Sequence, residues 1–428
     1  MKNPDPTKRT RFVAWLAAGA FWLPASLLCA QAQLNPMLHA ANAEVVDSGG
    51  APVLLRGVNL TPWLDPEPYL IGRGLWALLL SPSELKQNLA DIAGAEQAQS
   101  FWRQWEDAFV TEEDFRRLSS EGFNCVRLPI NYKDIVSKAE NGAVTLDKSG
   151  LQAVDRAVAW GKEYGIHVIL DLHVAPGGQN PVATVADIPS TDKTARLWQG
   201  SAAGQNQALL VAIWRELAAR YAGATSIGGY DLLNEPALPR DAPKDALPNL
   251  YKAIISAIRG VDPYHMVILE GDKYARDFSA LAPPPDANLM YEFHEYAIFN
   301  RAWNAPNQKA LDEFLQLRAA TRIPLFLGEF GEGSQDWQRQ MVGLMKANRI
   351  GWAVWPWKRI ELGNGHPVIE TIAMPDLWNK LSRYITGAPF APKPVPAEAR
   401  QGMSEMLEAV RTANCKEDAG LAGILAGK

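Results

Sequence analysis

The chain has 428 residues, of which 47% are hydrophobic and 21% are charged, a composition typical of a globular protein that buries a sizeable core. Its formal net charge is −5, and it becomes −8 without residues 1–32, because that segment carries four basic residues and one acidic residue. This acidic balance argues against nucleic acid as a partner.

The N-terminal segment has the pattern of a cleavable signal peptide. Three basic residues precede an apolar stretch at residues 12–30, and small residues at 30–32 offer a cleavage site. We therefore expect residues 1–32 to be removed, giving a secreted or periplasmic protein with no stable membrane partner. A membrane anchor is the alternative, because the apolar stretch approaches spanning length. Lipid attachment at Cys29 is disfavoured by the bulky Leu28 before it.

Beyond residue 50, short apolar runs alternate with longer amphipathic segments. The runs read as strands buried on both faces, at 53–59, 124–130, 167–173, 227–234, 266–271, 289–295, 324–330 and 350–357. The amphipathic segments read as helices, at 111–121, 149–164, 206–221, 244–259, 308–321, 334–348 and 375–385, with a short one at 273–281. Eight strand-then-helix units predict an α/β fold, a closed (β/α)8 TIM barrel.

Two segments lie outside this alternation. Residues 61–110 form a long insertion after the first strand and contain four tryptophans, for which loop packing and sugar contact are equally reasonable roles. Residues 387–397 are rich in proline and lead into an expected helix at 398–413. The predicted organisation is a signal peptide at 1–32, a catalytic barrel at 33–386 and a proline-rich linker with a C-terminal helix at 387–428.

Polar residues gather where the expected strands end. In this architecture the carboxyl ends of the strands meet at one face, and catalytic groups come from there. The candidates in chain order are Arg127, Asp171, His173, Asn234, Glu235, His294, Glu295, Tyr296, Glu329, Trp355 and Trp357.

Glu235 and Glu329 are expected to face each other across the barrel mouth. Paired carboxylates that flank a bond are the requirement for glycoside hydrolysis. The negative charge of Glu329 would raise the pKa of Glu235 and let it donate a proton, whereas Arg127 beside Glu329 would keep that carboxylate charged. Asn234 offers an amide to a sugar hydroxyl, and the tryptophans offer flat faces for sugar rings.

Seven motifs in this order resemble glycoside hydrolase family 5, the retaining β-glycosidases that include cellulases, mannanases and exo-β-1,3-glucanases. The resemblance covers residues 53–385. The motifs are Arg56-Gly57-Val58-Asn59, the stretch at 122–129, Asp171-Leu172-His173, Asn234-Glu235-Pro236, His294-Glu295-Tyr296, Gly328-Glu329-Phe330 and the tryptophan-rich last strand.

The resemblance implies a role for each matching residue. Glu235 would be the acid/base and Glu329 the nucleophile, supported by Arg127 and Tyr296. His173 and Asn234 would bind the sugar, and His294 would orient the acid/base. The sugar would stack on Trp355, or on Trp357, which points the same way if the strand continues. No metal or organic cofactor is implied.

The stretches at 109–132 and 171–180 look closest to the exo-β-1,3-glucanase-like branch of the family. After Asn180 the chain departs from the glucose-binding loop of that branch and reads Pro-Val-Ala-Thr-Val-Ala-Asp. Linkage and exo or endo action therefore stay open. A β-mannanase, a glycolipid-directed glycosidase and a barrel that only binds glycans are the alternatives to a β-glucan-type hydrolase.

Several polar residues at the strands have structural roles as their simplest interpretation. Asp171 is expected to be a hydrogen-bonded structural acid, and Glu295 to point toward the helices. His167 and His265, at strand beginnings, receive no function. Neither a His-x-His pair nor cysteines at metal-ligand spacing occur in the chain, so a metal site is not expected.

Overall fold

The computed structural model describes residues 35–140, 143–361 and 366–428. The expected signal peptide at 1–32 lies outside these residues. No helix in the described part of the chain combines the length and apolar character that a membrane span requires.

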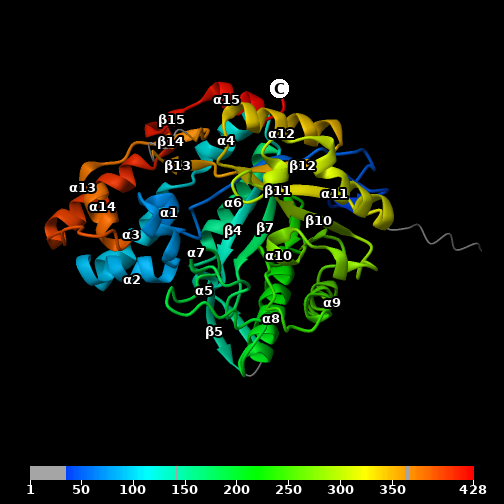
Figure 1. Cartoon of the computed structure of the whole chain (residues 1–428), viewed down its shortest axis with the longest axis horizontal. Coiled ribbons are helices and arrows are strands. Elements are labelled where there is room, and N and C mark those ends of the chain that lie inside the picture. Colours follow the sequence, from blue (N-terminus) through cyan, green and yellow to red (C-terminus); the bar gives the residue numbers. More distant parts are fainter. Residues whose placement is uncertain (1–34, 141–142, 362–365) are drawn as a thin grey trace, which may run out of the picture. The chain divides into compact units, whose positions relative to one another are not determined.

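A closed barrel of eight parallel strands forms the centre of the fold (Figure 1). Neighbouring strands follow chain order, and the last strand pairs with the first through Trp352 and Arg56. The strands are β3 (Arg56–Asn59), β4 (Cys125–Asn131), β7 (His167–Val174), β8 (Ile227–Asp231), β9 (Val267–Glu270), β10 (Leu289–His294), β11 (Leu325–Gly331) and β12 (Gly351–Trp355). The predicted (β/α)8 barrel is confirmed, and each observed strand lies in an expected apolar run or within one residue of it.

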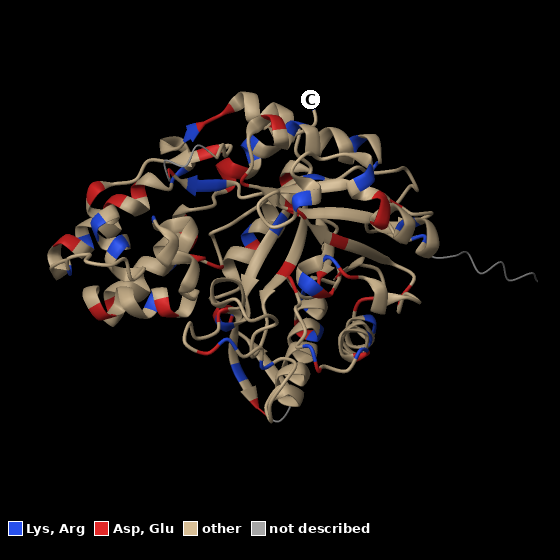
Figure 2. Ribbon diagram, in the orientation of Figure 1, with Lys and Arg blue, Asp and Glu red and all other residues tan. Residues whose placement is uncertain are grey.

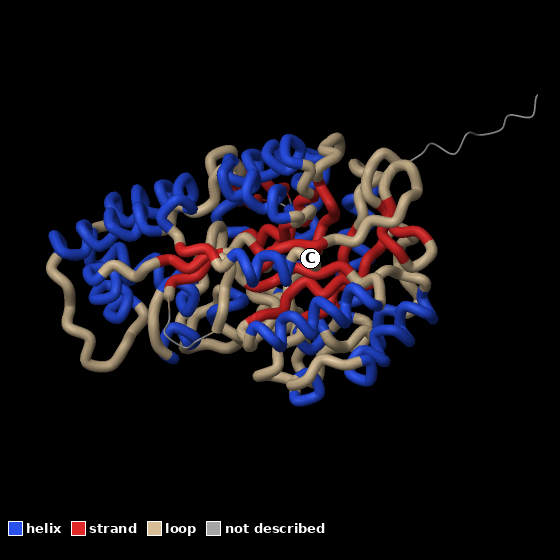
Figure 3. Tube along the Cα trace, turned by 90° about the horizontal axis from the view of Figure 1, so that it is seen from above, coloured by secondary structure: helices blue, strands red, loops and turns tan. Residues whose placement is uncertain are grey.

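Helices flank the strands on both sides when the barrel is viewed from above (Figure 3). Those that follow strands are α4 (Glu112–Glu121), α6 (Gln152–Tyr164), α8 (Ala203–Tyr221), α9 (Ala246–Arg259), α10 (Asp272–Ala275), η2 (Ser279–Leu281), α11 (Gln308–Thr321), α12 (Gln335–Ala347) and α13 (Asp376–Ile385). Helix α4 begins with a capping box, in which the Asp114 carboxylate accepts the backbone N–H of Thr111 at 2.8 Å.

Short elements decorate the barrel, mostly in its loops. The insertion after β3 holds α1 (Pro68–Ile71), η1 (Leu75–Leu79), α2 (Pro82–Ala93) and α3 (Ala95–Ala108). The others are β1 (His39–Ala41), β2 (Glu44–Val46), α5 (Tyr132–Ile135), β5 (Val136–Glu140), β6 (Ala143–Leu146), α7 (Ala183–Ala186), η3 (Arg301–Trp303), β13 (Lys358–Ile360), β14 (Glu370–Ile372), α14 (Pro396–Ala409), η4 (Thr412–Asn414), β15 (Lys416–Glu417) and α15 (Ala419–Leu425).

Charged residues of both signs are interspersed along the helices (Figure 2). The barrel interior is different near the beginnings of the strands, where it is filled by a compact apolar cluster. Its members from the strands include Cys125, Ile169, Ile268, Met290, Phe326 and Ala353. Because side chains alternate along a strand, the residues two positions later face the same interior, one layer nearer the carboxyl ends.

The segment after residue 386 packs against the barrel through a buried cation. The Lys358 ammonium lies 2.7 Å from the Asp114 carboxylate and donates hydrogen bonds to the Phe109 carbonyl at 2.6 Å and the Thr412 hydroxyl at 2.8 Å. In addition, the Trp352 indole N–H donates to the Leu425 carbonyl at 2.8 Å. One lysine thus links the end of the barrel to the cap of α4 and to the C-terminal segment.

Replacing this lysine tests how much stability the link contributes. In Lys358→Met the Asp114 carboxylate stays buried without its cation, which should lower the free energy of unfolding by about 3–5 kcal/mol at neutral pH. The loss should shrink in acid, because the pKa of Asp114 is held below its usual range by Lys358 against the opposing effect of burial. Urea unfolding at several pH values measures both effects.

The matched control is Lys162→Met, because this lysine lies exposed on α6. A change within about 0.5 kcal/mol is expected there. A loss below about 1 kcal/mol in Lys358→Met at neutral pH would contradict the proposed importance of the buried pair.

Candidate functional site

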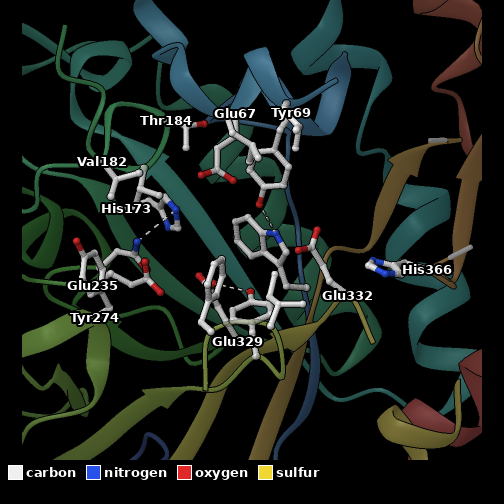
Figure 4. A pocket seen from close by; sticks show the side chains of 18 of the residues that line it. Glu67, Tyr69, His173, Val182, Thr184, Glu235, Tyr274, Glu329, Glu332 and His366 are labelled. Carbon is white, nitrogen blue, oxygen red and sulfur yellow. Dashed lines mark hydrogen bonds between the residues drawn. The ribbon is translucent and has the colours of Figure 1, made fainter. Parts of the chain in front are cut away.

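A cavity of about 820 Å³ opens where the barrel strands end. Strand ends and the residues just beyond them supply part of its lining: His173, Asn234, Glu235, Tyr296, Glu329 and Trp355. The insertion after β3 contributes Glu67 and Tyr69 from another side (Figure 4). The strands of the barrel therefore bring together residues that lie up to 182 positions apart, from His173 to Trp355.

Glu235 and Glu329 are neighbours in this cavity. An oxygen of each carboxylate and a ring nitrogen of His294 all lie within 4.8 Å of one another. Retaining glycosidases hold their two carboxyl groups about 5–5.5 Å apart, whereas inverting enzymes need about 6.5–9.5 Å to admit a water molecule. An approach of two carboxylate oxygens within 4.8 Å is nearer to the retaining than to the inverting spacing.

Each carboxylate oxygen of Glu329 accepts a hydrogen bond. Arg127 donates from Nη1 to one oxygen at 2.8 Å, and the Tyr296 hydroxyl donates to the other at 2.9 Å. A charge-assisted bond of this kind is about twice as strong as a neutral one. Glu329 is thus fixed in direction and has a cation beside it.

The strand alternation alone would not bring Glu329 into the barrel. Phe326 belongs to the interior cluster, so regular alternation would place Gly328 inside and Glu329 outside. The pairing register of β11 with β12 shifts between Leu327 and Phe330, and Glu329 reaches the cavity at this irregularity.

Glu235 is held differently, on the turn that follows β8. Its backbone has φ 46°, and its N–H donates to the Glu270 carboxylate at 2.6 Å. Its side chain lies 3.0 Å from Nδ1 of His294. Burial raises the pKa of Glu235, and Arg127 and Arg276 partly offset this rise. The expected direction is correct, but burial rather than the charge of Glu329 is the main cause.

One fully buried guanidinium organises the layer beneath the cavity. Arg127 lies within 3.2 Å of five carboxylates, those of Asp171, Asp231, Glu270, Glu292 and Glu329. It also donates to the side-chain oxygen of Asn234 at 2.9 Å. Arg127 has no exposed surface and does not line the cavity, so it is not placed to bind a substrate directly; it contacts Glu329 and Asn234 from beneath.

Protonation reduces the charge that this single cation has to balance. Burial raises the pKa of Asp171 and of Asp231 to about 7. It also raises the pKa of Glu270 and of Glu292 well above the usual range, helped by neighbouring acids. Some of these carboxyl groups therefore carry a proton at neutral pH, and the negative charge is concentrated on fewer groups.

The two histidines of the site are neutral near pH 7. Burial lowers the pKa of His173 to about 4 and that of His294 to about 3. Nδ1 of His173 lies 2.7 Å from Asp171, and its Nε2 lies 3.3 Å from the Asn234 amide nitrogen. As expected, Asp171 is a hydrogen-bonded acid that orients a neighbour rather than a group at the cavity surface.

Only one of the two candidate tryptophans lines the cavity. Trp355 does, with its indole N–H donating to the Tyr69 hydroxyl at 3.0 Å and its ring 5.5 Å from that of His173. Trp357 is fully buried and donates to Asp114 at 2.9 Å, so its alternative role as a sugar platform is corrected. The reason is that β12 ends at Trp355, and the alternation does not continue to Trp357.

Sequence reasoning missed several residues of the site. Glu292 stands two positions before His294 and Glu270 ends β9, so strand alternation offered a signal for both. Glu67, Tyr69 and Glu332 stand in the segments that connect barrel strands to the helices outside, and no period in the sequence marked them. In the insertion, Trp63 and Trp105 are core residues, whereas Trp76 is 43% exposed.

Three described groups combine histidine and carboxylate atoms at close range. They are Asp65, Glu67 and His173; Glu235, His294 and Glu329; and Glu270, Glu292 and His294. In the last two groups Arg127 contacts every acid except Glu235 at hydrogen-bond distance, and this positive charge disfavours a metal ion there.

Comparisons with known proteins agree with this geometry. A family model described as Cellulase (glycosyl hydrolase family 5) matches residues 85–360. A β-xylosidase from Phanerodontia chrysosporium is 28% identical, over 76% of this chain and 71% of the relative. A probable glucan 1,3-β-glucosidase A from Emericella nidulans is 29% identical (68% and 70%), and endoglucanase C from Acetivibrio thermocellus is 27% identical (62% and 89%).

Solved structures share the barrel fold. An endogalactoceramidase superposes with a TM-score of 0.57 at 19% identity, over 86% of this chain and 84% of that one. An endoglucanase Cel5A from Thermotoga maritima superposes with a TM-score of 0.51 at 17% identity, over 82% and 96%.

The Arg127 layer depends on a residue without a side chain. A Cβ added at Gly328 would lie 1.6 Å from Oε1 of Glu292, the oxygen that forms an ion pair with Nε of Arg127 at 2.8 Å. Gly328→Ala should therefore displace Glu292 and lower the free energy of unfolding by about 1–3 kcal/mol, measured by urea unfolding.

Gly343→Ala is the matched control, because a Cβ there meets nothing within 4 Å on the exposed face of α12. This change should be neutral or stabilise by up to about 1 kcal/mol. Equal stabilities of the two variants would contradict the tight packing of Gly328 on Glu292.

Proposed function

The chain belongs to glycosyl hydrolase family 5 and is a glycoside hydrolase, and from this premise we propose that it hydrolyses β-glucan-type glycosides with Glu235 and Glu329 as its reacting pair. The observation that carries the proposal is the approach of the two carboxylates within 4.8 Å, each with a different set of partners. This spacing supports a two-step reaction in which the sugar is held covalently between the steps.

Glu329 is the proposed nucleophile. Its hydrogen bonds from Arg127 and Tyr296 fix the direction of its carboxylate group. In the first step a Glu329 oxygen bonds to the anomeric carbon as the bond from that carbon to the leaving oxygen breaks. The glycosyl ester that forms carries no negative charge on Glu329. The positive charge of Arg127 is then balanced by the other buried acids around it.

Glu235 is the proposed acid/base. Its raised pKa favours a protonated carboxyl group that can deliver a proton to the leaving oxygen. Once deprotonated, the same group takes a proton from water, which attacks the anomeric carbon and releases Glu329. Each step inverts the anomeric centre, so the product keeps the β configuration.

The sugar at the cleaved bond is proposed to lie over Trp355. His173 and Asn234 supply polar groups next to it, and Tyr296 lies on the Glu329 side. Neutral His294 is proposed to orient Glu235 through the 3.0 Å contact. The names of the relatives that act on glucans, a glucan 1,3-β-glucosidase and an endoglucanase, support a glucose-type sugar.

We also propose that the enzyme is exported, with residues 1–32 as its signal peptide and residues 33–386 as the catalytic domain. The support is the basic and apolar pattern of the N-terminus. The remaining residues, 387–428, would be a linker and C-terminal helix that stabilise the barrel through contacts such as Thr412 to Lys358.

Substitution of the two glutamates separates their roles. Glu329→Gln should lower kcat at least about 10⁴-fold on every substrate. Glu235→Ala should lower it about 10²–10⁴-fold on natural glycosides and far less on dinitrophenyl glycosides, whose leaving group needs no proton. A 2-fluoroglycoside should label Glu329, and proton NMR should show a β product.

Glu163→Gln is the control, because this glutamate is exposed on α6. It should behave like the wild type. Equal, modest losses in Glu235→Ala and Glu329→Gln would contradict the assigned roles. A barrel that only binds glycans would turn over nothing and take no label.

The pH profile tests the state of Glu235. Because burial raises its pKa, the protonated acid survives above the ordinary glutamate pKa of about 4.3 and is lost as the pH rises through the raised value. The alkaline limb of kcat/KM on natural glycosides should therefore lie above that value. The alkaline limb should be absent from the profile of Glu235→Ala on dinitrophenyl glycosides. An alkaline limb that is unchanged in this variant would belong to another group.

A further inference from the structure

Exposed apolar side chains are concentrated at two places on this protein. Among the described residues, eight large apolar side chains are exposed, and six of these belong to the segments 75–79 and 298–299. Leu75 is 75% exposed and Phe299 71%. Apolar groups gathered in this way usually mark a binding surface.

Both segments border the cavity that holds Glu235 and Glu329. Leu75 and Leu78 of η1 line it, as do Ile298 and Phe299 from the loop after β10. Helix α7 packs against η1 and adds Val182 at its N-terminus and Val185 from within it. We call these six residues the apolar rim. They come from three segments that are far apart in the sequence, and the fold brings these segments together around the cavity.

The cavity is therefore amphiphilic. Its floor is polar and buried, with Asn234 at 1% and Glu329 at 4% exposure, whereas Leu75 and Phe299 of the rim stand in solvent. Figure 4 draws Val182, His173 and Glu235 on one side of the view and Glu332 and His366 on the other. Val182 of the rim is thus drawn on the side of Glu235, where the proposed leaving group departs.

The side chains of the apolar rim indicate whether the leaving group is a sugar or an alkyl chain. Sugar rings need polar partners for their hydroxyls, and an unpaired hydroxyl moved out of water costs free energy. Five of the six rim residues are aliphatic and offer neither a hydrogen bond nor an aromatic face. An alkyl chain meets no such cost and gains from the apolar area that it buries.

We propose that the natural substrate is a β-glycoside whose leaving group carries a long apolar chain, the chain lying on the apolar rim and the sugar on the polar floor. This inference rests on the proposed function. The bond broken runs from the anomeric carbon to the oxygen of the chain; that oxygen takes the proton of Glu235 and departs as a long-chain alcohol. Water then releases the sugar from Glu329, with no oxidant or reductant needed.

A series of alkyl glycosides tests the inference. The probes are butyl, hexyl, octyl and decyl β-glucosides and β-cellobiosides, used below their micelle concentrations so that only chain length varies. For the wild type, kcat/KM should rise with each added methylene, by up to about fourfold where the methylene is fully buried. The gain should level off when the chain extends past the rim.

Two variants assign the gain to the rim. Leu75→Ser combined with Leu78→Ser should reduce the gain per methylene to less than about twofold. The control is Phe390→Ser, which removes a fully exposed apolar side chain outside the cavity and should keep the full gain. Labelling of Glu329 by the 2-fluoroglycoside reports that the site of the double variant is folded.

The outcomes separate the two proposals. Turnover of aryl glucosides and cello-oligosaccharides without dependence on chain length would overturn the apolar leaving group and leave the proposed function in place. A chain-length gain that persists in the double variant would overturn the role of η1. Failure of the wild type to cleave or be labelled by any glycoside would overturn the proposed function, and this inference with it.

Discussion

The buried guanidinium of Arg127 is the constraint on which the site depends. Burial of a cation away from water costs free energy unless the cation is paired and hydrogen-bonded. Arg127 meets this condition through five carboxylates and Asn234. Those partners stand on different strands, so closure of the barrel is needed to assemble them. In return, Arg127 fixes Glu329 and Asn234 at the cavity floor.

The barrel interior changes character over two residues along several strands. Cys125, Ile169 and Met290 belong to an apolar cluster, and the next inward residues, Arg127, Asp171 and Glu292, are charged. The apolar layer removes water from one side of the charges, which raises the pKa values of the acids and keeps His173 and His294 neutral. The same burial raises the pKa of the proposed proton donor, Glu235, above the usual glutamate value.

The segments that follow the barrel strands supply side chains that surround the reacting pair in the cavity. Glu67 and Tyr69 bring polar groups from the insertion, and η1 of the same insertion brings Leu75 and Leu78. Polar floor and apolar rim are thus supplied partly by one segment. The proposed reacting groups stand at or just beyond strand ends and the rim stands on loops, so the proposal assigns catalysis and specificity to different parts of the barrel.

The barrel could be predicted from residue order alone, because continuous apolar runs and amphipathic segments alternate along the chain, and the same pattern placed Glu235 and Glu329 at or just beyond strand ends. The inward turn of Glu329 at a shift in strand register depends on the folded chain, as does the absence of Trp357 from the cavity, because its strand ends two residues earlier. The folded chain also decides the protonation of the acids and the meeting of Leu75 with Phe299 at one cavity. These features depend on burial and on loops, and no local period in a sequence encodes either.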